Sequence, residues 1–374
     1  MNDVYERLRA ACRSESEDAG IEILGEYAPV GRGGKVMPPT YPVDAGSTPY
    51  VIEQRLINGE VRDVVLLDSV PSEANRIEAE LNGLAEFAEL PIVRLSFTVG
   101  HAPETETAVV TSWTAPHRHA DAYFEHSLCG DKPFPSSREG RAILAALPTS
   151  AEALYHWFPG SLIFGAWTAR KKGQQARFPR VYTSEIVGYS PVVGARRAGR
   201  MDPLNLQQPT DGKLASSLGK KRLSEVGLGN IAPVEQHGGV TVERVVRSAW
   251  LSLTGLRRLS FGGGAERDAA ACAALAALAL WGDRLAFAGA SLWLRSGCEL
   301  LPLKESLLWR GPGERNESLD LNVVAAKELF VKARDEAVAA GIVMERGILE
   351  LTPQDDLQRA VEFTLMRAEG VDEA

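Results

Sequence analysis

A long stretch with little apolar periodicity, from residue 165 to 233, divides the chain into two parts that carry the signs of regular structure. Gly, Pro, Gln, Arg and Lys dominate it, which is typical of a long excursion from a core. Before it, strand patterns at 21–27, 50–57, 61–67 and 92–97 accompany one helix pattern. After it, a strand pattern at 245–261 leads to a helix at 265–281 and a strand at 291–303. This order is compatible with a ferredoxin-like β-α-β-β-α-β core.

Local signals sharpen this expectation. Asn58-Gly59 separates two strand patterns and is the strongest short signal for a hairpin turn. The helix that follows begins at Asp68, Ser69 and Pro71, and its apolar stripe consists of Ala74, Ile77, Leu81 and Leu84. We also expect helices over 1–12, 323–340 and 353–367, and a projecting loop over 31–42, where glycines and prolines exclude regular structure.

The charge is segregated along the chain. The net charge is -8 and the isoelectric point is near 5.5, which by themselves argue against a nucleic-acid-binding protein. From 170 to 222, however, twelve Lys or Arg face three acidic residues, so this stretch carries +9 and the remainder carries -17. Such a segment can focus positive potential on one face. The alternative is a solvated basic loop.

Aromatic residues alternate with the cations at the start of this stretch. They are Phe164, Trp167, Phe178, Tyr182 and Tyr189. Cations neutralise phosphates and aromatic faces stack on unpaired bases, and neither reads sequence. The pattern favours binding of a single-stranded nucleic acid, although some of these aromatics are equally compatible with a core.

A second cluster suggests a rival function. His117, His119, His126 and Cys129 supply nitrogen and sulfur ligands that zinc accepts. Their spacing matches no known ligand pattern, so we expect no metal and no cofactor. A metal-dependent enzyme or nuclease built on these four residues remains the alternative.

Other features exclude several classes of protein. Neither GRGGKV nor FGGGAERD has the full pattern of an ATP-binding loop, although the second could present backbone N–H groups at a helix start. The cysteines, at 12, 129, 272 and 298, are scattered and form no CxxC pair. Free cysteines of this kind are compatible with a reducing compartment.

Secretory-signal and transmembrane patterns are lacking, since the apolar run 269–280 is short and flanked by Asp268 and Asp283. We therefore expect a cytoplasmic protein that contacts no membrane.

Several long phrases resemble a known family. VLLDSVPSEANRIEAEL (65–81), APHRHADAYF (115–124), SLIFGAWTARKK (161–172), FPRVYTSEIVGY (178–189) and KRLSEVGLGNIAP (221–233), with PPTY at 38–41, occur in the right order. They are similar to the backbone protein of the type I-G (formerly I-U) CRISPR complex, in the Cas-seven group of the repeat-associated RNA-binding (RAMP) superfamily. The resemblance runs from about residue 30 to 300.

The resemblance implies an antiviral-defence function without catalysis by this subunit. It implies an α+β fold, a modified RRM or ferredoxin-like palm with finger and thumb insertions: residues 1–164 and 241–374 form the palm and C-terminal helices, and 165–240 the basic finger and thumb. Copies would assemble into a helical filament on crRNA and present it for pairing with a target DNA strand, because specificity belongs to base pairing. Further partners would be the large subunit, a fused guide-processing and cap subunit, and a recruited helicase-nuclease.

The matched phrases also imply the residues that contact the guide. We expect RNA binding by Asn75, Arg76, Arg118, Arg170, Lys171, Lys172, Arg177, Arg180, Lys220, Lys221 and Arg222. Arg257 and Arg258 are weaker candidates. Related type III subunits cleave RNA with a loop aspartate, for which Asp68 and Asp121 are the nearest counterparts, but a type I assignment implies no cleavage.

Overall fold

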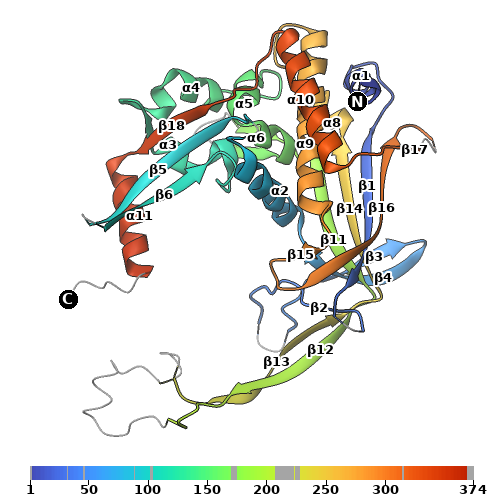
Figure 1. Cartoon of the computed structure of the whole chain (residues 1–374), viewed down its shortest axis with the longest axis vertical. Helices are drawn as coiled ribbons and strands as arrows, with labels where there is room; N and C mark the ends of the chain where they lie inside the picture. The colour runs from blue at the N-terminus through green and yellow to red at the C-terminus, as the bar shows by residue number, and fades with distance from the viewer. Residues whose placement is uncertain are drawn as a thin grey trace.

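The protein has a mixed α/β fold organised by one large antiparallel sheet (Figure 1). The computed structural model describes residues 2–31, 33–44, 47–87, 89–101, 104–169, 175–206, 223, 228–313 and 316–368. Among these, eight strands form the main sheet. Along its path they are β15 (Leu292–Trp293), β16 (Glu299–Arg310), β1 (Gly20–Pro29), β14 (Arg244–Ser252), β11 (Tyr182–Tyr189), β4 (Glu60–Asp68) and β3 (Ile52–Ile57), and β17 (Asn316–Ser318) pairs with β16.

Helices cover one face of this sheet. The central helix is α9 (Ala265–Phe287), which contacts α1 (Asn2–Ala11), α2 (Val70–Leu84), α8 (Leu253–Leu256) and α10 (Val323–Ala339). Its alanine-rich sequence lets these neighbours approach closely. At Gly282 an added Cβ would lie 2.5 Å from Ile77 Cγ2, so glycine permits the contact between α9 and α2. By length and composition α9 alone among the described helices could span a membrane, yet 89% of its most apolar window is buried inside the protein.

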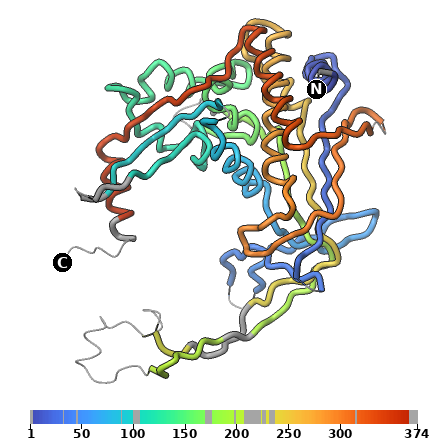
Figure 2. The backbone as a smooth tube through the Cα atoms, viewed as in Figure 1, coloured from blue at the N-terminus to red at the C-terminus, as the bar shows by residue number. Residues whose placement is uncertain are grey.

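A second sheet lies beyond α2, and the two parts give the chain a C-shaped outline (Figure 1). Its strand order is β6 (Glu104–Thr111), β5 (Ile92–His101), β18 (Ile348–Pro353), β7 (Ser127–Cys129) and β8 (Lys132–Pro133). Short helices pack around it: η1 (Arg118–Ala120), α3 (Ala122–Glu125), η2 (Phe134–Ser136), α4 (Arg138–Leu144), α5 (Glu152–Trp157), α6 (Pro159–Phe164) and α11 (Asp355–Ala368). Figure 2 follows the described chain from α1, beside α10, to α11, at the far side of this sheet.

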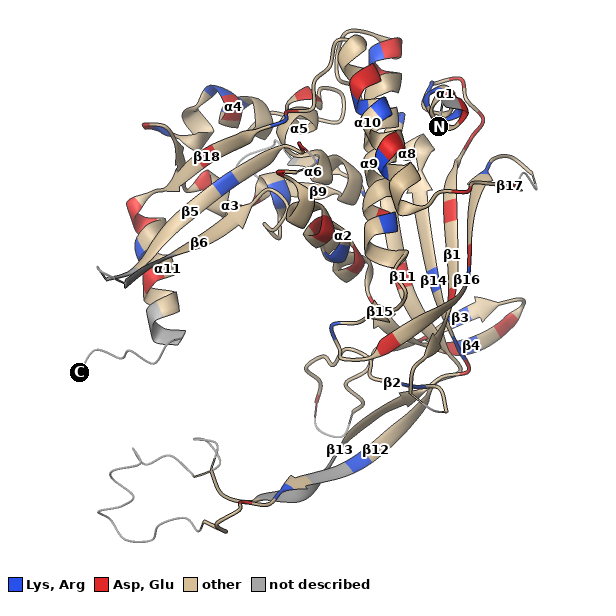
Figure 3. Ribbon diagram, viewed as in Figure 1, with Lys and Arg blue, Asp and Glu red and all other residues tan. Residues whose placement is uncertain are grey.

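Two hairpins leave the sheets. β12 (Val192–Arg200) and β13 (Ile231–Thr241) form a long ribbon that extends away from the main sheet and pairs with β2 (Lys35–Val36) at its base. The shorter hairpin consists of β9 (Ala166–Ala169) and β10 (Gln175–Phe178). Figure 3 shows basic residues on the ribbon, and by sequence β12 contains Arg196, Arg197 and Arg200.

The structure confirms the strongest local predictions. The Asn58-Gly59 turn joins β3 to β4, and Ser69 caps α2 by accepting a hydrogen bond from the Ser72 N–H at 3.4 Å. The excursion predicted from 165 to 233 is wrong over β11, because this strand pairs with both β14 and β4 within the main sheet. The loop predicted over 31–42 is also interrupted, by β2.

A buried ion network joins the helices to the main sheet. Arg247 points from β14 into the helix layer, where its Nε donates to Glu73 Oε2 of α2 at 3.3 Å and its Nη2 donates to Tyr182 Oη at 2.7 Å. The same Nη2 pairs with Asp283 of α9, which also binds Arg284. Arg247, Glu73 and Asp283 are each fully buried. The Arg247 guanidinium stacks on Phe287, 3.4 Å from the ring centroid.

The two carboxyl groups respond differently to burial. Burial raises the pKa of Glu73 to about 7, against the opposing effect of Arg247. Burial alone would raise the pKa of Asp283 too, but Arg247, Arg284 and Tyr182 together lower it to about 2. Glu73 Oε1 has no hydrogen-bond partner among the described residues, whereas both oxygens of Asp283 accept hydrogen bonds. Arg247 is therefore neutralised mainly by Asp283.

Replacing Arg247 with Ala should lower the free energy of unfolding by about 3–5 kcal/mol, because Asp283 would keep a buried charge with one fewer partner. Urea denaturation measures this change. Arg244→Ala is a matched control, since Arg244 lies on the same strand with its side chain exposed. Equal effects of the two substitutions would contradict the role given to the network.

The raised pKa of Glu73 predicts a pH dependence of stability. Its pKa is about 4.5 when unfolded and about 7 when folded, so between these values the folded state holds the extra proton. The free energy of unfolding should therefore fall by up to roughly 3 kcal/mol as the pH rises through this window, and stay level above it. Glu73→Gln should remove this fall. Identical slopes in urea titrations of both proteins across the window would refute the prediction.

Candidate nucleic-acid interface

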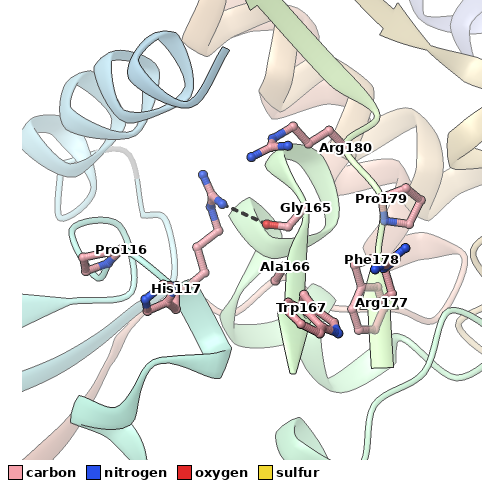
Figure 4. Close-up of a pocket in the computed structure, with 10 residues that line it drawn as sticks. Pro116, His117, Gly165, Ala166, Trp167, Arg177, Phe178, Pro179 and Arg180 are labelled. Atoms are coloured by element: carbon pink, nitrogen blue, oxygen red, sulfur yellow. Dashed lines mark hydrogen bonds between the residues drawn. The ribbon is translucent and has the colours of Figure 1, made fainter. Parts of the chain in front are cut away.

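A cavity of about 330 Å³ lies where the β9–β10 hairpin meets η1 (Figure 4). Its lining brings together three of the residues predicted to bind RNA, Arg118, Arg177 and Arg180, and contains no acidic residue. The remaining lining residues are Pro116, His117, Gly165, Ala166, Trp167, Phe178 and Pro179. The Arg177 and Arg180 guanidinium groups, without an acidic neighbour in the lining, make this cavity suited to an anion.

Arg118 is buried beneath the cavity, where it joins three elements of the chain. It is 8% exposed, and its Nε and Nη2 donate to the two carboxylate oxygens of Glu78 at 2.6 and 2.8 Å. Its Nη1 donates to the Gly165 carbonyl at 2.8 Å, the dashed contact in Figure 4. Burial raises the pKa of Glu78, although Arg118 opposes the shift. Arg118 thus binds α2 through a bidentate buried ion pair and binds the residue before β9 through a hydrogen bond.

Gly165 allows the close approach of the two hairpin strands at this point. Its φ of +80° lies in the region that favours glycine. A Cβ here would lie 2.9 Å from the Phe178 carbonyl oxygen and 3.0 Å from Arg180 Cγ. Arg180 therefore extends directly over Gly165, as Figure 4 shows.

Trp167 and Arg177 form the outer wall of the cavity. They occupy paired positions of the β9–β10 ladder, and the Arg177 guanidinium lies 5.8 Å from the centroid of the Trp167 ring. Trp167 is 55% exposed, and Arg177 and Arg180 are exposed as well. Neither arginine has a carboxylate partner within the described part of the chain. Both cations can therefore meet a ligand in solvent.

The other predicted RNA-binding residues lie elsewhere. Asn75 is exposed on α2, one turn before Glu78. Arg76 donates to Asp68 Oδ2 at 2.9 Å and to the Trp293 carbonyl at 3.0 Å. Among the weaker candidates, Arg257 donates to the carbonyls of Ala11 and Asp18, and Arg258 is exposed. The remaining predicted residues fall outside the described ranges: Arg170, Lys171, Lys172, Lys220, Lys221 and Arg222.

The aromatic residues divide into three groups by exposure to solvent. Phe164, Phe178 and Tyr182 are each at most 2% exposed and belong to the core, so the stacking role considered for them is wrong. Tyr189 is partly buried beneath the Arg244 guanidinium, which lies 4.3 Å from its ring centroid. Trp167 is the aromatic of the set that remains open to solvent.

The four candidate metal ligands do not converge. His119 is buried, with Nδ1 2.9 Å from Ser161 Oγ and its ring edge-on to Phe178, whereas His117 and His126 are exposed and line different cavities. Throughout the described residues, no group of three or more His, Cys, Asp or Glu side chains is arranged to hold a metal ion. The rival metal site therefore lacks the required geometry.

The remaining carboxylates and the glycine run have structural roles. Asp121 caps α3, accepting hydrogen bonds from the N–H groups of His117 and Tyr123 at 3.0 and 3.1 Å. In the first turn of α9, Asp268 accepts hydrogen bonds from Phe261 N–H and Ser260 Oγ at 2.7 and 2.9 Å. Asp268 thus fixes the segment that leads into the glycine run against the first turn of α9.

Residues 21–192 match the model of a family described as CRISPR-associated protein GSU0053 (Cas_GSU0053). No curated protein matches the chain. The matched segment extends from β1 to the first residue of β12 and includes Glu78 and every residue that lines the cavity. The match supports a CRISPR-associated protein.

Arg118 and Arg180 should respond differently to truncation. Arg118→Ala leaves Glu78 buried without its partner, so the free energy of unfolding should fall by about 3–5 kcal/mol. Arg180→Ala removes an exposed side chain and should change it by no more than about 0.5 kcal/mol. Chemical denaturation of the two variants measures the difference, and a stable Arg118→Ala protein would contradict the structural role of the pair.

Proposed function

We propose that this CRISPR-associated protein is the backbone subunit of a type I-G surveillance complex, which polymerises along crRNA and binds its phosphates without reading sequence. The observation that carries the proposal is the cavity at which the exposed Arg177 and Arg180 meet without an acidic residue in the lining. An arginine fork suits the paired oxygens of a phosphate. The cavity also lies within the segment that matches the CRISPR-associated family.

The strand order supports an RRM-like palm as part of this proposal. The strands β16, β1, β14 and β11 are neighbours in that order and pair antiparallel. Along the chain, α2 lies between β1 and β11, and α9 lies between β14 and β16. This is the order of a ferredoxin-like β-α-β-β-α-β unit. The β9–β10 hairpin and the β12–β13 ribbon are our candidates for finger and thumb.

The proposed assembly requires several partners. They are the crRNA, a target DNA strand that pairs with it, further copies of this chain, the large subunit, the fused guide-processing and cap subunit, and a recruited helicase-nuclease. We place this assembly in the cytoplasm. The subunit itself is proposed to be non-catalytic, because its nearest candidate aspartates are engaged: Asp68 pairs with Arg76 and Asp121 caps α3.

What copurifies with the protein separates this proposal from the metal-enzyme alternative. Purified with its complex, the protein should carry RNA of uniform length. Stoichiometric zinc without nucleic acid would instead support an enzyme that uses His117, His119, His126 and Cys129. Cleavage of complementary RNA with magnesium, lost in Asp68→Ala, would contradict the non-catalytic role.

Replacing Arg177 and Arg180 together with Ala should weaken RNA binding and reduce its dependence on salt. Each phosphate neutralised on a single strand contributes a slope of about 0.7, so the slope of log affinity against log salt should flatten by about 0.7 if the two arginines share one phosphate and by about 1.4 if each binds its own. Filter binding of single-stranded RNA over a salt series measures it. The double substitution of Arg138 and Arg359 removes the same charge from exposed positions outside this cavity and should leave the slope unchanged.

A further inference from the structure

The basic cavity has an aromatic wall as well as cations. Phosphate binding alone would not require an exposed indole, and exposing 55% of Trp167 to water is unfavourable without a partner. The ladder fixes the backbone position of Trp167. Trp167 is directly opposite Arg177, and the adjacent Thr168 is 6% exposed and donates its hydroxyl to the Ala176 carbonyl at 3.3 Å.

The arrangement of charge and ring matches the parts of a nucleotide. At one side of the cavity, Arg180 extends over Gly165; at the other, Trp167 lies beside Arg177 (Figure 4). The phosphate of a nucleotide requires cations, and its base requires a flat apolar face. The space of about 330 Å³ is at the lower end of ligand-binding pockets and suits one nucleotide rather than a base pair.

We propose that Trp167 is the stacking platform for one unpaired nucleotide of the guide RNA, whose phosphate lies between Arg177 and Arg180. This inference rests on the proposed function and adds a base contact to it. The contact is independent of base identity, because every base offers a π-face.

The test measures the full-length protein and Trp167→Ala on two oligonucleotides of equal length and charge. One is unstructured single-stranded RNA, and the other is the same ribose phosphate chain without bases. Trp167→Ala should weaken binding of the first by roughly 5- to 140-fold, the range that one lost stacking contact gives. It should leave binding of the abasic chain and the salt slope unchanged, and Trp167→Phe should restore much of the lost affinity.

The outcomes separate this inference from the function on which it rests. If Trp167→Ala binds both oligonucleotides as the wild type does, while the Arg177 and Arg180 variant loses affinity, the stacking platform is wrong and the guide-binding proposal stands. Equal losses on both chains would reveal a structural effect and overturn the platform. Single-stranded DNA of the same sequence is a third ligand, and a greater loss on DNA than on RNA would overturn the assignment to the guide. Failure of the wild type to bind either chain would remove the proposed function itself.

Discussion

The attraction between Arg247 and the carboxylates around it is the constraint on which the architecture depends. A fully buried guanidinium in the centre of a sheet is stable only where opposite charges and hydrogen-bond acceptors surround it. Here they come from α2, α9 and β11, so the network can form only when both helices lie on the same face of the sheet. The burial that stabilises the core thus also fixes the relative position of these elements.

A second buried ion pair, between Glu78 and Arg118, connects α2 to the cavity. α2 contributes Glu73 to the core network and Glu78 to the pair with Arg118. Arg118 in turn binds the Gly165 carbonyl, at the residue before β9. One helix therefore connects the central sheet to the hairpin with the exposed arginines. The three arginines of the cavity therefore have different roles: Arg118 is buried and bound within the protein, whereas Arg177 and Arg180 face solvent.

The sequence anticipated those parts of the fold that depend on neighbouring residues. The hairpin at Asn58-Gly59, the start of α2 at Ser69 and the start of α9 at residue 265 follow from turn, cap and periodicity signals. β18 was missed because its pairing with β5 joins residues more than two hundred positions apart, which no local signal encodes. β11 was missed because charged neighbours obscure the few apolar residues of this central strand.

The candidate site was anticipated in composition but not in arrangement. The charge count identified Arg177 and Arg180, and Trp167 was among the aromatics between the cations. Their convergence with Arg118 depends on long-range packing, as does the partnership of Arg118 with Glu78, forty residues earlier. The signal available for the core network was Arg247 itself, a charged residue at an inward position between Val245 and Ala249.

The β9–β10 ladder is short, so the orientation of the Trp167 indole depends on its register. Each strand contains four residues, and neighbouring side chains point to opposite sides, so a slip of one position would turn the indole inward and bring Thr168 to the surface. Glu78 does not line the cavity, yet through Arg118 it anchors Gly165, the residue that precedes the ladder. Substitution of Glu78, which does not line the cavity, would then weaken ligand binding in the same way as removal of the Trp167 indole.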